Sequence, residues 1–251
     1  MNSIRSTQSK NILDYKVVVF DLDGTLYFQN SLRVKMAVRM AKYYLCHPFR
    51  IREFFIVKKF REVREAWDDI YHSLSGDKDW DRLYESMLNE KASGDLNKMQ
   101  YSYVAKKMKV DYKKVEFAIN KWIYENPLDV VYETRDTQLL EYIEYLRKSG
   151  IKVVILSDYP TKDKLNALKL KVDGEYSALD SSINELKPSP MGLQVIMKDF
   201  GVSESDILMV GDRYSKDGMA AIHAACEYVI LPKSKNKRNY KCIFEPLSVN
   251  H

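Results

Sequence analysis

Residues 17–27 of this 251-residue chain read VVVFDLDGTLY, an apolar run that ends in two aspartates two positions apart. The run predicts a strand over residues 15–20 that is buried on both faces, as in a parallel sheet. Side chains at i and i+2 of an extended segment point the same way, so we expect Asp21 and Asp23 to reach one site at the carboxyl edge of the sheet. Two neighbouring carboxylates repel one another, and Mg²⁺ is the oxygen-preferring ion that relieves this repulsion. The stretch therefore predicts a ligand site at that edge.

The C-terminal half alternates predicted strands and helices. Three short apolar runs are the expected strands, at residues 151–156, 206–210 and 228–231. Helix-like segments follow them, at residues 164–170, 191–200 and 218–226. Strands that alternate with helices predict an α/β fold with a parallel sheet.

The composition is typical of a folded protein without a membrane span. Forty basic against 35 acidic residues leave a net charge of +5, which is too small to imply a nucleic-acid partner. No apolar run approaches the roughly 18–20 residues that cross a bilayer, and the N-terminus lacks the apolar core of a secretory signal. The three cysteines form no C-x-x-C pair. We therefore expect a cytoplasmic protein with no disulfide, zinc site, nucleic-acid partner or membrane partner.

Residues 28–131 contain no convincing strand and much helical periodicity, so they predict an inserted helical module. Its charge is uneven: residues 31–64 carry ten Lys or Arg and two Glu, whereas residues 65–95 carry nine acids and three bases. This segregation permits a positive face, or two solvated helical surfaces that attract one another. The basic tail, residues 233–241, is expected to be a loop.

The chain resembles the haloacid dehalogenase (HAD) superfamily at four motifs in the expected order. The first is the D-x-D-G-T stretch after the buried strand, and the second is a strand that ends in Ser. The third is a Lys followed by Pro, and the fourth is a strand followed by Gly-Asp and a further Asp. The residues that carry them are Asp21, Asp23, Ser157, Lys187, Asp212 and Asp217.

The resemblance implies a role for each of these residues. Asp21 would be the nucleophile that forms an aspartyl-phosphate, and Asp23 the general acid and base. Ser157 and the backbone N–H of Asp158 would bind the phosphate, while Lys187 neutralises its charge. The implied Mg²⁺ ligands are the carboxylates of Asp21, Asp212 and Asp217 and the backbone carbonyl of Asp23.

Structural explanations stay open for several of these residues. An Asp-Gly pair is common in turns, so Asp23 has a simple turn role available. Ser157 has the alternative of capping a helix that starts near Pro160, and Asp217 that of capping the helix predicted at residues 218–226.

The expected protein has a Rossmann-like core, residues 1–27 and 132–251, and an inserted all-helical cap, residues 28–131, as in the phosphoglycolate-phosphatase-like group. The resemblance implies a Mg²⁺-dependent phosphomonoesterase that acts on a small phosphorylated metabolite. Many relatives have an acidic residue where this chain has Phe28, so their substrates do not transfer directly. A phosphomutase of the same family, and a non-catalytic phosphate-binding regulatory module, are the alternatives.

Overall fold

The computed structural model describes residues 4–5, 10–67 and 95–244. The chain divides into two compact units: Met1–Leu32 with Val131–His251, and Arg33–Val130 between them. The first is an α/β unit, and the second is helical.

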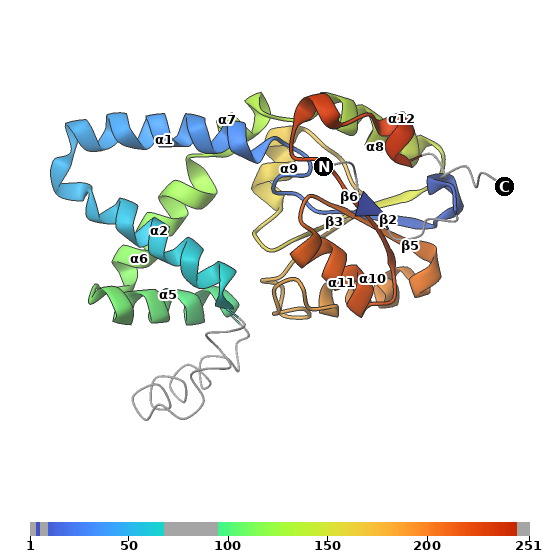
Figure 1. The fold of residues 1–251 in the computed structure, drawn as a ribbon. Coiled ribbons are helices and arrows are strands. Elements are labelled where there is room, and N and C mark those ends of the chain that lie inside the picture. The colour runs from blue at the N-terminus through green and yellow to red at the C-terminus, as the bar shows by residue number, and fades with distance from the viewer. Residues whose placement is uncertain (1–3, 6–9, 68–94, 245–251) are drawn as a thin grey trace. The chain divides into compact units, whose positions relative to one another are not determined.

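The α/β unit is built on a six-stranded sheet in the order β1-β6-β5-β2-β3-β4 (Figure 1). Its five parallel strands are β2 (Val17–Phe20), β3 (Lys152–Ser157), β4 (Gly174–Ser177), β5 (Ile207–Gly211) and β6 (Glu227–Ile230). The short β1 (Ile4–Arg5) pairs antiparallel with β6 at one edge. The predicted α/β fold with a parallel sheet is thereby confirmed.

β2 lies at the centre of the sheet, between β5 and β3, and all four of its residues are fully buried. Its last residue, Phe20, is in register with Ile155 of β3 and Val210 of β5. The carboxyl ends of these three strands are therefore level with one another. The residues that follow them, which carry three of the four motifs, meet at one edge.

Helices cover both faces of the sheet in this unit. Figure 1 shows α8 (Thr137–Lys148) and α12 (Tyr240–Phe244) on one face, and α10 (Met191–Phe200) and α11 (Met219–His223) on the other. Apolar side chains of α10 and α11, including Leu193 and Ala220, pack with Val19 and Met209 of the sheet in one buried core.

Several local predictions need correction. The helix expected at residues 218–226 begins earlier, with a π-helical turn η5 (Tyr214–Gly218), and its α-helical part ends at His223. β4 was not predicted, because its sequence GEYS is half exposed at the sheet edge and lacks an apolar run. The basic tail is not all loop: it leads through Arg238 into α12.

The second unit contains no strand among its described residues. Its α-helices are α1 (Gln29–Cys46), α2 (Arg52–Glu65), α5 (Leu96–Met108), α6 (Tyr112–Ile119) and α7 (Leu128–Glu133). The boundaries with the α/β unit fall within α1 and α7. A π-helical turn, η3 (Asn120–Glu125), follows α6. α2, α5 and α6 pack together through Phe60, Val104 and Val115, all fully buried. Residues 68–94, which make up most of the acidic stretch at residues 65–95, lie outside the described residues. In the part of the chain that the structure describes, no helix is long and apolar enough to cross a bilayer.

Candidate active site

Three carboxylates from two distant parts of the chain converge at the carboxyl edge of the sheet. Asp21 follows β2, Asp212 follows β5, and Asp217 lies in η5. Each offers an oxygen atom, and the three atoms lie within 4.8 Å of one another. All three side chains are buried. The D-x-D-G-T motif and the Gly-Asp motif, 190 residues apart, thus form one acidic cluster.

Lys187 is the basic side chain that the structure places in this cluster. Its Nζ donates hydrogen bonds of 2.6 Å to Asp21 Oδ1 and 2.6 Å to Asp217 Oδ1, and one of 3.3 Å to the carbonyl of Leu156. Burial opposes the charge of this ammonium, but the carboxylates of Asp21 and Asp217 outweigh it and raise the pKa of Lys187. A permanently charged lysine therefore faces three carboxylates.

One positive charge does not balance three negative ones, and the carboxylate pKa values reflect this. Burial raises the pKa of Asp21 to about 8; Lys187 opposes the shift, and repulsion from Asp217 and Asp212 adds to it. Burial and repulsion from Asp217 raise the pKa of Asp212 to about 6. With Lys187 as its cation, the cluster disfavours the state in which all three carboxylates are ionised. A site that needs additional positive charge behaves in this way.

The residues of the cluster fit a small divalent cation. Asp212 Oδ1 is buried and has no hydrogen-bond partner among the described residues, and a buried oxygen of this kind needs a cation, a proton or water. Gly24 has a φ of +99°, and a Cβ there would lie 2.5 Å from Asp212 Oδ2. The first-motif loop can approach the carboxylate this closely only because residue 24 has no side chain. Oxygen ligands alone, without nitrogen or sulfur, are the donor set that Mg²⁺ prefers.

Asp217 is oriented by the loop before it and does not cap the helix after it. Its Oδ2 accepts hydrogen bonds from the backbone N–H groups of Asp212, at 3.1 Å, and Arg213, at 3.0 Å. α11 begins without a side-chain cap at Gly218. The capping alternative for Asp217 is therefore wrong, and its Oδ1 is left to face Lys187.

Ser157 and Asp158 lie where the second motif places them, at the end of β3. Ser157 Oγ accepts a hydrogen bond of 3.1 Å from the backbone N–H of Tyr159, and the N-cap of α9 (Lys162–Leu168) is Thr161, so Ser157 does not cap that helix. Asp158 Oδ1 accepts a hydrogen bond of 3.0 Å from the backbone N–H of Lys187. The Asp158 side chain thus holds the third motif against the second.

Asp23 has two partners that sequence reasoning missed. Lys164 Nζ donates to both of its oxygens, at 2.6 and 2.8 Å, and the hydroxyl of Tyr27 donates to Oδ1. Burial on its own would raise the pKa of Asp23, but the charge and hydrogen bonds of Lys164, with the hydrogen bond from Tyr27, outweigh it and lower that pKa. Asp23 is therefore held as a carboxylate. Helical spacing predicts only that residues 164–170 form a helix. It does not indicate that Lys164 contacts Asp23, which lies 141 residues away in the sequence.

Arg238 is a second residue that the sequence did not single out. It donates hydrogen bonds to the carbonyls of Gly24, at 2.6 Å, and Thr25, at 2.7 Å, and to Asp136 Oδ2, at 3.1 Å. Arg238 and Asp136 are both buried, and the hydroxyl of Tyr240 also donates to Asp136. The C-terminal segment thereby fixes the backbone of the first-motif loop.

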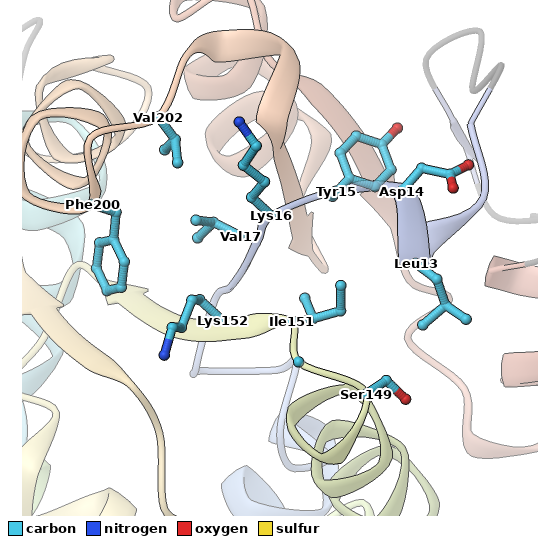
Figure 2. A pocket seen from close by; sticks show the side chains of 11 residues that line it. Leu13, Asp14, Tyr15, Lys16, Val17, Ser149, Ile151, Lys152, Phe200 and Val202 are labelled. Atoms are coloured by element: carbon cyan, nitrogen blue, oxygen red, sulfur yellow. The ribbon is translucent and has the colours of Figure 1, made fainter.

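A pocket of about 440 Å³ lies at the opposite end of the sheet from the carboxylates (Figure 2). It is lined by residues 13–17 and 149–152, which lead into the amino ends of β2 and β3, and by Phe200 and Val202. Its lysines are paired with aspartates outside the pocket lining, Lys16 with Asp206 at 3.2 Å and Lys152 with Asp173 at 3.8 Å. No residue of the acidic cluster lines this pocket.

A match to a family model agrees with the four motifs. The family model for haloacid dehalogenase-like hydrolases matches residues 15–225. A 2-haloacid dehalogenase from Pseudomonas syringae pv. Tomato DC3000 is similar in structure, with a TM-score of 0.53 and 16% identity over 85% of each chain. A HAD phosphatase from Thermococcus onnurineus has a TM-score of 0.49 and 21% identity over 90% of this chain and 89% of its own. A predicted phosphoglycolate phosphatase from Haemophilus somnus 129PT has a TM-score of 0.47 and 19% identity over 86% and 84%. No curated protein matches the sequence.

Structural likeness at these identities bears on the fold and does not separate phosphatases from dehalogenases. The match to the family model bears on the family itself, because it spans all four motifs and most of the chain. The convergence of Asp21, Lys187, Asp212 and Asp217 at one sheet edge is the geometry that those motifs require. The chain belongs to the haloacid dehalogenase-like hydrolases.

Proposed function

We propose that the protein is a Mg²⁺-dependent phosphomonoesterase that acts on a small phosphorylated metabolite. The observation that carries the proposal is the charge of the buried cluster: three carboxylates within 4.8 Å face one lysine, and Asp212 Oδ1 has no partner within the described chain. Such a cluster supports chemistry that uses a divalent cation. The acid at position 23 also favours phosphate esters, because the resemblance to the family implies an acid there for ester hydrolysis and a non-acidic residue in its dehalogenase members.

In the first step, an oxygen of Asp21 attacks phosphorus while the bond from phosphorus to the ester oxygen breaks, giving an aspartyl-phosphate and an alkoxide. Asp23 donates a proton to that alkoxide. Lys187, which contacts Asp21 at 2.6 Å, offsets the repulsion between the nucleophile and the phosphate. When bound by Asp21, Asp212, Asp217 and the Asp23 carbonyl, Mg²⁺ supplies the charge that keeps the carboxylates ionised and polarises the phosphoryl oxygens.

In the second step, water attacks phosphorus, its proton passes to Asp23, and the bond from Asp21 to phosphorus breaks. This step needs Asp23 as a carboxylate, the form that Lys164 and Tyr27 favour. The first step needs Asp23 protonated, a form that the ammonium of Lys164, hydrogen-bonded to both of its oxygens, disfavours. Lys164 is therefore a positioning residue that holds Asp23 in its base form, and the acid form requires this contact to weaken.

The helical unit is proposed to act as the cap that selects the leaving group and excludes water. Arg39 of α1 is a basic residue of this unit that has a role other than substrate binding. It donates to both oxygens of Asp129, at 2.8 and 2.6 Å, within the same unit. This ion pair accounts for the side chain of Arg39.

Phosphate release from an aryl phosphate and from a panel of sugar and nucleoside monophosphates tests the proposal. We expect release that requires Mg²⁺ and that Asp21→Asn abolishes, while the thermal melt of the variant remains cooperative. Absence of release across the panel, with Mg²⁺ still stabilising the protein, would favour a phosphate-binding module. Interconversion of a sugar phosphate without release, in the presence of a sugar bisphosphate, would favour a phosphomutase. Halide release from a 2-haloacid without metal would favour a dehalogenase.

A further inference from the structure

The helical unit exposes an apolar surface on α1 and on the turn that leads into α2. We define the α1–α2 patch as Val34, Val38, Leu45, Phe49, Ile51 and Phe55. Phe49 is fully exposed to solvent, and Leu45 is 83% exposed. Scattered single apolar residues on a surface are ordinary, but these six and Phe54 make seven exposed apolar residues within 22 consecutive positions, which is more than scattered exposure.

The part of the patch that lies on α1 follows helical geometry. Val34, Val38 and Leu45 are spaced i, i+4 and i+11, which places them on one face of α1. Met36 and Tyr44 are buried and lie on a different face of the same helix. α1 is therefore apolar on two faces, one packed within the protein and one directed to solvent.

The segment that carries the patch is rich in basic residues. Residues 31–64 carry ten Lys or Arg and only Glu53 and Glu62. Both acids are already engaged: Glu53 accepts hydrogen bonds from Lys121, at 3.1 Å, and Trp122, at 3.0 Å, and Glu62 pairs with Lys59 at 3.2 Å. The exposed basic residues of this segment include Lys42 and Lys58, and also Arg50 and Arg52, of which Arg50 lies 3.7 Å from Glu53 and Arg52 donates to the carbonyl of Met108.

We infer that the α1–α2 patch docks the protein on an anionic lipid surface. A bilayer interface accepts both kinds of side chain at once, because the acyl region takes the apolar groups and the headgroup phosphates pair with Lys and Arg. A second copy of the chain would bring two strongly basic segments together, which is unfavourable. A nucleic acid would neutralise the charge but leave Val34, Val38 and Leu45 with nothing apolar to contact.

This inference revises the expectation of no membrane partner. That expectation rested on the lack of a segment long enough to span a bilayer, and a spanning segment is not required for a helix that lies in the interface. Docking of this kind is independent of the proposed phosphatase activity, so each can fail without the other.

Vesicle flotation with the full-length protein tests the inference. The probes are vesicles of phosphatidylcholine alone and of phosphatidylcholine with about 30 mol% phosphatidylglycerol, at about 0.05 M and about 0.5 M salt. We expect partitioning into the anionic vesicles at low salt, at least about tenfold weaker binding to the neutral ones, and a large loss at high salt.

Two paired variants separate the apolar from the charged contribution. Leu45→Ser/Phe49→Ser should lower partitioning by at least about tenfold, because both side chains lose an apolar environment. Lys42→Ser/Lys58→Ser should lower it by about fivefold per lysine. The matched controls, Leu13→Ser/Ile222→Ser and Lys148→Ser/Lys171→Ser, remove exposed side chains of the same kinds in the α/β unit and should leave partitioning unchanged.

Several results would overturn the inference. These are no binding to anionic vesicles at low salt, equal losses in the variants and their controls, or binding that ignores the Leu45→Ser/Phe49→Ser change. Concentration-dependent self-association that this same variant removes, without vesicle binding, would assign the patch to a second copy of the chain. Thermal melts of all four paired variants check that the fold is intact.

Discussion

Lys164 Nζ lies 2.6 and 2.8 Å from the two carboxylate oxygens of Asp23, and both side chains are largely withdrawn from solvent. The pair lowers the pKa of Asp23 in the folded protein against an opposing effect of burial. It therefore contributes stability that is present above the unfolded pKa of an aspartate, near 4, and is lost as the pH falls through the lowered folded pKa.

Lys164→Met should consequently reduce the free energy of unfolding at pH 7.5 by about 3–5 kcal/mol, because it leaves a buried carboxylate without its partner. The difference from the unmodified protein should shrink as the pH falls below about 4. Denaturant melts at several pH values measure this, with Lys162→Met, an exposed lysine of the same helix, as control. The double variant Lys164→Met/Asp23→Asn should recover most of the loss, and a double variant as unstable as the single one would contradict the account.

The pKa values of the acidic cluster predict a pH-dependent response to metal. The raised pKa values of Asp21, about 8, and Asp212, about 6, mean that the metal-free fold loses stability as the pH rises from about 4 through these values. Mg²⁺ binds the ionised forms, so its stabilising effect on the melting temperature should grow from pH 5 to pH 8. A metal effect that is constant over this range would contradict the assignment of the site.

Asp212→Asn should separate the charge of this residue from its place in the fold. Without metal at pH 8, the melting temperature of the variant should exceed that of the unmodified protein by about 2–4 °C for each kcal/mol of repulsion removed. The reason is that the substitution removes a buried charge whose Oδ1 has no hydrogen-bond partner among the described residues. With Mg²⁺, it should gain little or nothing. Asp163→Asn, at an exposed position, is the control and should change neither melt.

Gly24 and Gly150 offer a matched pair of substitutions. Both have positive φ angles, +99° and +88°, so alanine at either position costs about 1 kcal/mol of backbone strain. A Cβ at residue 24 would lie 2.5 Å from Asp212 Oδ2, whereas one at residue 150 would meet nothing within 4 Å. Gly24→Ala should therefore abolish the Mg²⁺-induced rise in melting temperature, and Gly150→Ala should retain it. Equal responses would show that the close approach does not matter.

Arg238 is expected to act through the loop that it holds. Arg238→Met leaves Asp136 buried without its cation and the carbonyls of Gly24 and Thr25 without their donor, so the free energy of unfolding should fall by about 3–5 kcal/mol. Phosphate release should show a lower kcat with little change in KM, because the loop carries Asp21 and Asp23 rather than substrate contacts. Lys237→Met, at an exposed neighbour, should leave both quantities unchanged. A fall in stability without any effect on kcat would make Arg238 structural only.

The location of the core strands and of the four motifs could be read from the sequence, because both depend on local patterns. A continuous apolar run marks β2, and the residues directly after β2, β3 and β5 carry three of the four motifs. β4 could not be predicted from the sequence, because an edge strand is half exposed and needs no apolar run. The start of η5 could not be predicted either, because a π-helical turn has no periodic sequence pattern of its own.

Sequence by itself determined the α/β class and the family, and it predicted six site residues, since each stands in a short motif next to a recognisable strand or loop. They are Asp21, Asp23, Ser157, Lys187, Asp212 and Asp217. Tertiary structure alone decided which side chains restrain them. Lys164 lies 141 residues from Asp23, and Arg238 lies 214 residues from Gly24. Contacts over such separations are set by how the strands are ordered in the sheet, and a lysine on a helix or an arginine in a basic tail looks the same in the sequence whether it faces water or a buried carboxylate.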